Sequence, residues 1–477
     1  MNGSTNVGPA IGVPPPTPNR CGSKRAPRPP PACGVRPRPG LLGSHRVNRP
    51  DYLEGMDDRT LLLEAFRAGL AGVEPESATV RAAKRVDVRH ARRVIAIAAG
   101  KASLPMARGL AAAVDIADGV IVAPDHGEAP LPLIVGGHPV PNEGSAAGAL
   151  RALELASSAG PDDVVVCLIS GGASALLAAP ARGLNLDDLR ETNQVLLECG
   201  TEIVETNTVR KHLSAIKGGW LAAAAGRSRL VTLVLSDVVG DPLDVIASGP
   251  TVPDPTTYGD ALAVIDRNGI FNRLSTRSLG HLQRGRRGLV EETPKQPHLR
   301  HEIEIIGSGT VAANAAASFL RSRGVPARIV STRHAGEARE AAVSAVSAAS
   351  HVGEVLIFSG ETSVVVRGTG RGGRNQEAAL AAALEVDGQP ITFLALGSDG
   401  IDGPTDAAGG IVDGGTIGRG LAANFDPFAA LADNDTYPFL AAAGDLIVTG
   451  PTGTNVADLW MVRRRGESDP VDHEHRQ

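Results

Sequence analysis

The chain is predicted to fold as an α/β protein with mostly parallel sheets and two domains. Short β-branched runs alternate with Ala- and Leu-rich stretches of helical spacing over most of its length, which is typical of βαβ units. At 477 residues the chain is longer than one hydrophobic core usually supports, and this favours two domains.

Ten strands are expected, in two groups on either side of a charged linker at residues 283–300. We therefore place one domain at residues 56–290 and a second at 301–465. The expected strands cover residues 94–98, 119–123, 164–169, 230–235, 302–306, 327–330, 355–358, 392–396, 446–448 and 459–462.

Composition indicates an ordinary globular protein and argues against several partners. A net charge of −5 and an aromatic content of 3% give no support for binding nucleic acid or an anionic membrane. No apolar run reaches the roughly 18 residues that a membrane span needs. Because the four cysteines show no metal-binding spacing, we expect a reduced, cytoplasmic location.

The two ends of the chain are expected to be disordered, over residues 1–55 and 466–477. Residues 1–50 hold 12 of the 34 prolines and eight Lys or Arg, but no Asp or Glu. Such a segment cannot bury enough apolar surface to offset its chain entropy. Our hypothesis is that translation starts at Met56, where a helical pattern begins; finding residues 1–50 intact in the native protein would exclude it.

Two charged residues directly follow expected strands, where open α/β sheets bind ligands. Lys101 follows the first strand, and its charge suits a phosphate or carboxylate, although a plain surface lysine is the commoner explanation. Asp237 follows the fourth strand and is a candidate general base or metal ligand, with a turn-forming role as the alternative.

A glycine-rich turn after the third expected strand is a candidate phosphate-binding loop. Its backbone N–H groups can close around an anion, assisted by the dipole of the following helix. A tight turn without a ligand explains the glycines equally well, but the two serines favour a ligand. The candidate residues are Ser170, Gly171, Gly172, Ala173 and Ser174.

The most informative stretch is the Gly-Arg-Gly-Gly-Arg run that ends at Arg374. Arg371 and Arg374, with Gly373 and Asn375 beside an expected helix start, are predicted to bind anions. The fork of Arg374 can bind two phosphoryl oxygens and neutralise charge that develops during phosphoryl transfer. A structural salt bridge is the competing interpretation, but glycine neighbours would give such a bridge little packing.

A loop with three carboxylates follows this run, at Asp399, Asp402 and Asp406. These carboxylates repel one another unless a cation or hydrogen-bond donors share the site. Mg²⁺ is the favoured cation because it takes one or two carboxylates together with phosphate oxygens. Asp237 and Asp399 are the candidate metal ligands.

Residues 307–312 read Gly-Ser-Gly-Thr-Val-Ala and match the dinucleotide-binding pattern weakly. Arg333 follows at a position where an arginine suits the 2′-phosphate of NADPH. Close packing of a helix on a strand explains the glycines equally well. His138 lies in a Gly/Pro-rich loop, where a structural hydrogen bond is its commoner role.

Taken in order, these motifs resemble the glycerate 2-kinase family that carries the MOFRL domain. The resemblance covers roughly residues 57–462, and the matching segments are residues 99–102, 137–142, 170–174, 208–214, 235–238, 248–251, 373–377, 397–400 and 453–455.

The resemblance implies an enzyme that transfers the ATP γ-phosphoryl group to the 2-hydroxyl of D-glycerate. ATP and Mg²⁺ are the implied cofactors, D-glycerate and ATP are the small-molecule partners, and a homodimer is an assembly left open. A larger N-terminal Rossmann-like α/β domain and a smaller C-terminal α/β (MOFRL) domain are implied, with the active site in the cleft between them. The family's catalytic residues correspond to Lys101, Asp237 and Arg374.

The carboxylate of glycerate also needs a cation, for which Arg210 and Lys211 are the candidates. The main alternative function is an NAD(P)H-dependent hydroxypyruvate reductase, which the motif at residues 307–312 supports. A non-catalytic nucleotide-binding module is a third possibility, with little support because all three catalytic residue types are present.

Overall fold

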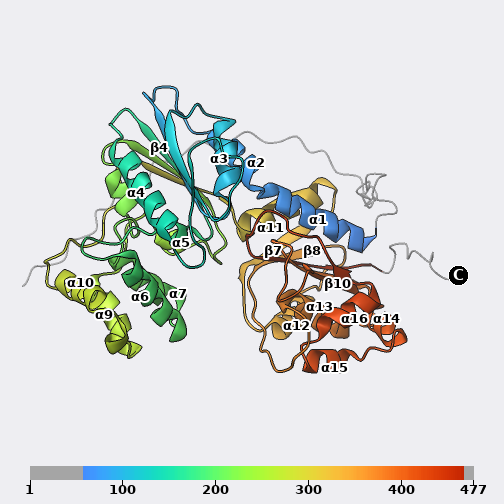
Figure 1. Cartoon of the computed structure of the whole chain (residues 1–477). Coiled ribbons are helices and arrows are strands. Elements are labelled where there is room, and N and C mark those ends of the chain that lie inside the picture. Colours follow the sequence, from blue (N-terminus) through green and yellow to red (C-terminus); the bar gives the residue numbers. More distant parts are fainter. Residues whose placement is uncertain (1–56, 467–477) are drawn as a thin grey trace, which may run out of the picture. The chain divides into compact units, whose positions relative to one another are not determined.

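The chain forms two six-stranded sheets with helices on both faces of each, as this computed structural model shows (Figure 1). The structure describes residues 57–466. The expected extension at residues 1–55 and all but the first residue of the expected tail lie outside the described residues. No helix within residues 57–466 is long and apolar enough to cross a membrane.

The first sheet is entirely parallel, in the order β3-β2-β1-β4-β5-β6. Helices α2 and α3 pack on one face and α4, α5 and α8 on the other, so the central strands β1 and β4 are buried along their whole length. The strands are β1 (Val94–Ala99), β2 (Asp118–Ala123), β3 (Leu133–Val135), β4 (Val164–Ser170), β5 (Arg229–Leu235) and β6 (His301–Gly307). The helices are α2 (Pro75–Ala83), α3 (Ser103–Ala111), α4 (Glu143–Ser157), α5 (Ala173–Leu176) and α8 (Trp220–Ala224).

The strand order of this sheet reverses between β1 and β4. The reversal leaves a crevice at the carboxyl ends of these two strands, which is where doubly wound sheets bind their ligands. A ligand is therefore expected to bind at the turns after β1 and β4.

Four helices form a smaller apolar cluster beside the first sheet. Leu196, Val209, Ile265 and Leu282, one from each helix, are fully buried in it. The helices are α6 (Leu186–Glu198), α7 (Ile203–His212), α9 (Tyr258–Arg267) and α10 (Thr276–Arg286).

The second sheet is mixed, in the order β11-β10-β9-β12-β8-β7. Among the neighbouring strands of this sheet, β7 and β8 pair in parallel. β12 lies between β8 and β9 and pairs antiparallel with both. Its strands are β7 (Ala327–His334), β8 (Val355–Gly360), β9 (Ile391–Gly397), β10 (Gly409–Asp413), β11 (Leu446–Ile447) and β12 (Asp458–Arg464). Its helices are α1 (Asp58–Gly72), α11 (Gly309–Ser322), α12 (Ala338–Ser347), α13 (Arg374–Glu385), α14 (Thr416–Ala422), α15 (Pro427–Ala432) and α16 (Thr436–Ala443).

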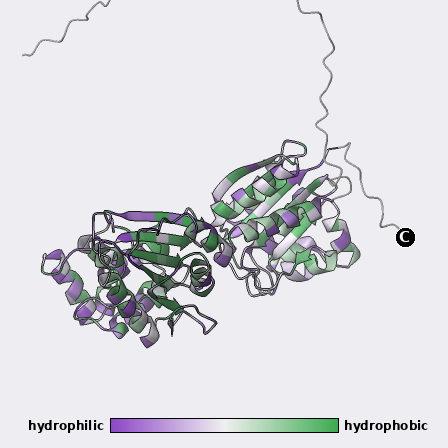
Figure 2. Cartoon of the chain, turned by 90° about the horizontal axis from the view of Figure 1, so that it is seen from above, coloured by the Kyte–Doolittle hydropathy of each residue, from purple (hydrophilic) through white to green (hydrophobic). Residues whose placement is uncertain are grey.

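The α/β class and all ten expected strands are confirmed. The β-branched runs predicted them, and Figure 2 shows hydrophobic residues along many of the strands and a mixture of both kinds on the helices. Two strands were missed: β3 has only three residues, and β10 opens with two glycines, which have little strand propensity. The expectation of mostly parallel strands is correct for the first sheet and wrong for the second.

Two elements join a sheet that their position in the chain does not suggest. β6 follows the expected linker, yet it pairs in parallel with β5 of the first sheet. α1 comes first among the described elements, yet Leu62 and Phe66 on it share a core with Leu394 and Met461 of the second sheet. The domain limits drawn from sequence order stay a prediction, and the sheets exchange elements across them.

Replacing Phe66 by alanine should destabilise the protein by about 3–5 kcal/mol, because it leaves a cavity in the core of the second sheet. Phe66 is 2% exposed, whereas Phe428 is 70% exposed and supplies the matched control. Denaturant unfolding measures both variants. An effect of Phe66→Ala no larger than that of Phe428→Ala would contradict the packing of α1.

Candidate active site

The turns that follow β1 and β4 are joined by hydrogen bonds at the switch point of the first sheet. The Lys101 N–H donates to the Gly171 carbonyl at 2.8 Å, and the Ala102 N–H donates to Ser170 Oγ at 3.0 Å. Gly100 has φ +126°, and a Cβ on it would lie 2.1 Å from Ser170 Oγ. Only glycine at position 100 lets the two turns come into contact. This contact places Lys101 beside the glycine-rich turn.

Three polar side chains lie against Gly171 and Gly172. A Cβ on Gly171 would be 2.1 Å from an Asp237 carboxylate oxygen. A Cβ on Gly172 would be 2.9 Å from the His138 ring and 3.3 Å from the Lys101 side chain. His138, for which the sequence favoured a structural role, therefore lies with Lys101 and Asp237. The motif Gly-His-Pro was the only signal for it.

The charges of this cluster act on one another. Burial raises the pKa of Asp237, Lys101 and His138 work against this rise, and Glu361 adds to it. Burial also lowers the pKa of His138, and the charge of Lys101 lowers it further. A carboxylate with a raised pKa is a stronger base while ionised, so Asp237 is suited to accept a proton near neutral pH.

The helix that follows the expected phosphate-binding turn is shorter than the sequence suggested. This helix, α5, is only four residues long, so it offers little of the helix dipole that the prediction relied on. Ser174 Oγ lies 2.6 Å from Ser248 Oγ, and Ser248 in turn donates to Asn207 at 2.8 Å. Phosphate binding by residues 170–174 stays a prediction.

Arg374, at the first position of α13, is held by two carboxylates. Its Nε and Nη2 donate to the two oxygens of Asp458 at 2.6 and 3.0 Å, and its Nη1 donates to Glu361 at 2.6 Å. Burial opposes the charge of Arg374, but these carboxylates overcome that effect and hold its pKa above the ordinary value. The side chain of Asp458 is 4% exposed and that of Glu361 48%, so one partner is fixed and the other faces solvent. The salt bridge that the glycine neighbours seemed to disfavour is therefore present.

The N-terminus of α13 holds a carboxylate of the protein itself. Asp402 accepts hydrogen bonds from the Asn375 and Gln376 N–H groups at 3.0 and 2.9 Å. Asn375 is fully buried, and its side-chain oxygen accepts from Trp460 Nε1 at 2.7 Å. A Cβ on Gly373 would be 2.4 Å from Asp402. Gly373 and Asn375 thus receive Asp402 where the sequence predicted a phosphate, and a role for them in binding ATP has no support from these contacts.

The other residues of the expected anion and metal sites have separate partners and do not form one site. Arg371 turns to Asp406, at 3.0 Å, and stacks on the Tyr437 ring, so it does not assist Arg374. Hydrogen-bond donors relieve the repulsion in the aspartate loop, since Asp399 accepts from the Ile401 N–H at 3.0 Å. Within residues 57–466 no three His, Cys, Asp or Glu side chains come close enough to hold a metal ion.

A cavity of about 700 Å³ connects several of the predicted residues, and its size suits a small-molecule ligand. Most of its wall comes from the loops around α13. The candidate residues that line it are Asp237, Gly373, Arg374 and Asp399, together with Glu361.

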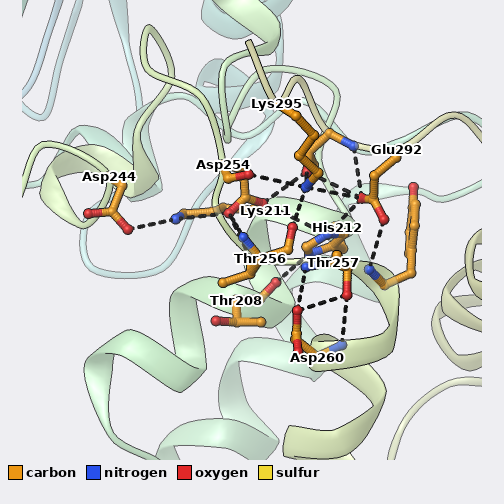
Figure 3. A network of polar contacts seen from close by, with 12 residues as sticks. Thr208, Lys211, His212, Asp244, Asp254, Thr256, Thr257, Asp260, Glu292 and Lys295 are labelled. Atoms are coloured by element: carbon orange, nitrogen blue, oxygen red, sulfur yellow. Dashed lines mark hydrogen bonds and ion pairs between the residues drawn. The ribbon is translucent and has the colours of Figure 1, made fainter. Parts of the chain in front are cut away.

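The two candidates for binding the substrate carboxylate have different surroundings. Lys211 points into a network of acidic residues (Figure 3), with its Nζ 3.3 Å from Asp244 and 3.4 Å from Asp254. These contacts explain Lys211 as a structural ion pair and give no support to its predicted role. Arg210 instead donates from Nε to Asn193 at 2.7 Å and lines a small separate cavity.

The motif at residues 307–312 is not a dinucleotide-binding unit. Such a unit needs two parallel strands of one sheet on either side of its helix. Here β6 belongs to the first sheet, whereas β7, which carries Arg333, belongs to the second. A Cβ on Gly309 would lie 2.2 Å from Ser359 Oγ, so close packing accounts for this glycine.

Comparison with known proteins adds independent information. Residues 61–283 match a family described as a domain of unknown function, DUF4147, and residues 354–458 match the MOFRL family. A D-glycerate 2-kinase of Thermotoga maritima is 40% identical, over 84% of this chain and 97% of that protein. A glycerate 2-kinase of Pyrococcus horikoshii is 39% identical, over 85% and 97%. A protein of Agrobacterium vitis provisionally named hydroxypyruvate reductase is 41% identical, over 87% and 99%.

Two solved structures share the fold. A protein of Pyrococcus horikoshii superposes with a TM-score of 0.81 at 38% identity, covering 86% of this chain and 99% of that one. A glycerate kinase of Thermotoga maritima gives a TM-score of 0.78 at 38% identity, covering 85% and 99%.

Proposed function

Because the chain belongs to the glycerate 2-kinase family, we propose that it transfers the γ-phosphoryl group of ATP to the 2-hydroxyl of D-glycerate. The bond from the γ-phosphorus to the bridging oxygen breaks, and a bond to the glycerate oxygen forms. ADP and 2-phosphoglycerate are released. One observation carries the proposal: Asp237 contacts the turn beside Lys101 and also lines the same cavity as Arg374.

The proposed roles follow from charge and position. Asp237 accepts the proton that the glycerate hydroxyl loses, since its raised pKa makes it a stronger base than an ordinary aspartate. Lys101 and Arg374 stabilise the negative charge that spreads over the transferring group. Arg374 is suited to this because Asp458 fixes its guanidinium before the substrate arrives.

ATP is proposed to occupy the cavity of about 700 Å³, with its phosphates toward Asp237 and Arg374. Asp399 lines it together with Asp237. As the alternative to its role as base, the Asp237 carboxylate would join Asp399 and phosphate oxygens as ligands of Mg²⁺. Bound there, Mg²⁺ would neutralise part of the triphosphate charge.

We also infer a cytoplasmic enzyme. The two cysteines within the described residues, Cys167 and Cys199, are both free thiols, which fits a reducing compartment. A homodimer stays a prediction that light scattering of the purified protein can test.

The purified protein should release ADP with D-glycerate and ATP, and phosphorus NMR should show 2-phosphoglycerate as the product. Replacing Arg374 by alanine should lower kcat by roughly 10³-fold or more, as expected for an arginine that stabilises the transferring group. NADPH oxidation with hydroxypyruvate is the parallel assay. Hydride transfer without ADP release would sink the proposal, and an Arg374→Ala enzyme within a few-fold of wild type would remove Arg374 from the mechanism.

Replacing Asp458 by asparagine should lower kcat by roughly ten- to a hundredfold, because the guanidinium of Arg374 loses its fixed partner. KM for D-glycerate should change little, since Asp458 acts through Arg374. Glu361→Gln is the matched control: it removes the solvent-facing partner of the same guanidinium and should cost less than threefold in kcat. Equal losses in both variants would contradict a positioning role for Asp458.

The acidic limb of the kcat/KM profile should lie above the pKa of about 3.9 of an ordinary aspartate. Because the pKa of Asp237 is raised, the base becomes protonated and activity falls while pH is still higher than that value. Glu361→Gln removes one charge that raises this pKa, so the limb should move to lower pH. Circular dichroism over the same range separates titration from unfolding. An identical limb in both enzymes would contradict this assignment.

A further inference from the structure

Two cations, the buried Lys217 and the half-buried Arg210, lie together outside the cluster of Lys101 and Asp237. Lys217, between α7 and α8, is 5% exposed and donates from Nζ to the carbonyls of Ser174 and Leu177, both at 2.6 Å. Arg210 on α7 donates from Nε to Asn193 Oδ1 at 2.7 Å. All these acceptors are neutral.

No carboxylate of residues 57–466 forms an ion pair with either cation. Burial lowers the pKa of Lys217 to about 7, with Arg210 as a second cause, and burial alone lowers the pKa of Arg210. The neighbouring Lys211 shows the contrast, because Asp244 and Asp254 balance its charge. Burial and the neighbouring Arg210 disfavour the charged form of Lys217, and a bound anion would offset that cost.

A small cavity lies beside the pair. Arg210, Lys217, Asn193, Thr192 and Ser174 supply its polar wall, and its volume is about 20 Å³. This volume suits one water-sized group, so an oxygen of a carboxylate or a phosphoryl group can enter while a triphosphate cannot. No Asp or Glu lines the cavity, and the rest of its wall is apolar, from Pro141, Ala178, Leu189 and Leu213.

The cavity also lies next to the proposed reaction centre. Ser174, whose carbonyl accepts from Lys217, belongs to the turn on which Asp237 and Lys101 pack. Helix α5 begins within this turn, and Lys217 binds carbonyls at both of its ends. An anion bound by Lys217 and Arg210 would therefore lie beside the helix that begins in this turn.

We propose that Arg210 and Lys217 form an oxyanion subsite that takes one oxygen of a carboxylate or phosphoryl group of a substrate. The proposal rests on the proposed kinase function for the identity of these substrates. It adds Lys217 to the residues that bind substrate and leaves Lys211 with a structural role.

The test compares Arg210→Gln and Lys217→Met with wild type, and the exposed Arg182→Gln is the control for loss of one positive charge. KM for D-glycerate and KM for ATP are measured separately by ADP release. A rise of roughly tenfold to a hundredfold is expected for one of them, the range for a lost hydrogen bond to a charged group. A higher KM for D-glycerate identifies the carboxylate as the occupant, and a higher KM for ATP identifies a phosphoryl group.

Thermal unfolding with D-glycerate, ATP or inorganic phosphate as the probe gives a readout that needs no turnover. Wild type should be stabilised by at least one probe, and Arg210→Gln should lose that stabilisation, while Arg182→Gln should keep it. Arg210→Lys retains the charge and should show a smaller loss, which keeps the test informative if Arg210→Gln does not fold.

The subsite is excluded if both KM values stay within twofold of wild type and each probe stabilises wild type and variants equally. Such a result with normal ADP release would leave the proposed function intact. Probe binding that depends on Arg210, in a protein that releases no ADP, would instead support the subsite and contradict the kinase proposal.

Discussion

The backbone contact between the turns after β1 and β4 is the constraint on which the candidate site depends. The strand order brings these two carboxyl ends together, and glycines at 100, 171 and 172 let the turns approach without side chains between them. The space that a Cβ would take is occupied by Ser170, Asp237 and His138. The contact therefore requires a close approach of the two backbones, which these glycines permit.

In the second sheet, carboxylates of the protein hold the polar groups at the start of α13 in place. Asp402 occupies the N-terminus of α13, and Asp458 fixes the guanidinium that begins the same helix. Both carboxylates are buried, so their hydrogen bonds are little weakened by water. A guanidinium held in this way is preorganised, and preorganised charges are the main means by which enzymes stabilise developing charge. Arg210 and Lys217 show the opposite arrangement, because neither cation forms an ion pair with a carboxylate of the described residues.

Much of the fold was predictable because strands and their turns have local signals. β-branched runs marked ten strands, and the residues directly after them included Lys101 and Asp237. The local sequence does not indicate which sheet an element joins. β6 and α1 joined sheets on the far side of the expected boundary, because burial of their apolar faces, and not their order in the chain, selects their neighbours.

The sequence by itself determined the elements, the glycines and the types of charged residue that the chemistry needs, since these depend on neighbours along the chain. Only the tertiary structure decided which charges meet. Arg374 and Asp458 are 84 residues apart, yet they form a partly buried ion pair. Lys211 and Arg210 are adjacent in the chain but face carboxylates and a cavity respectively. Charged side chains pair with groups that are close in space, and the order of the strands decides which segments of the chain come close.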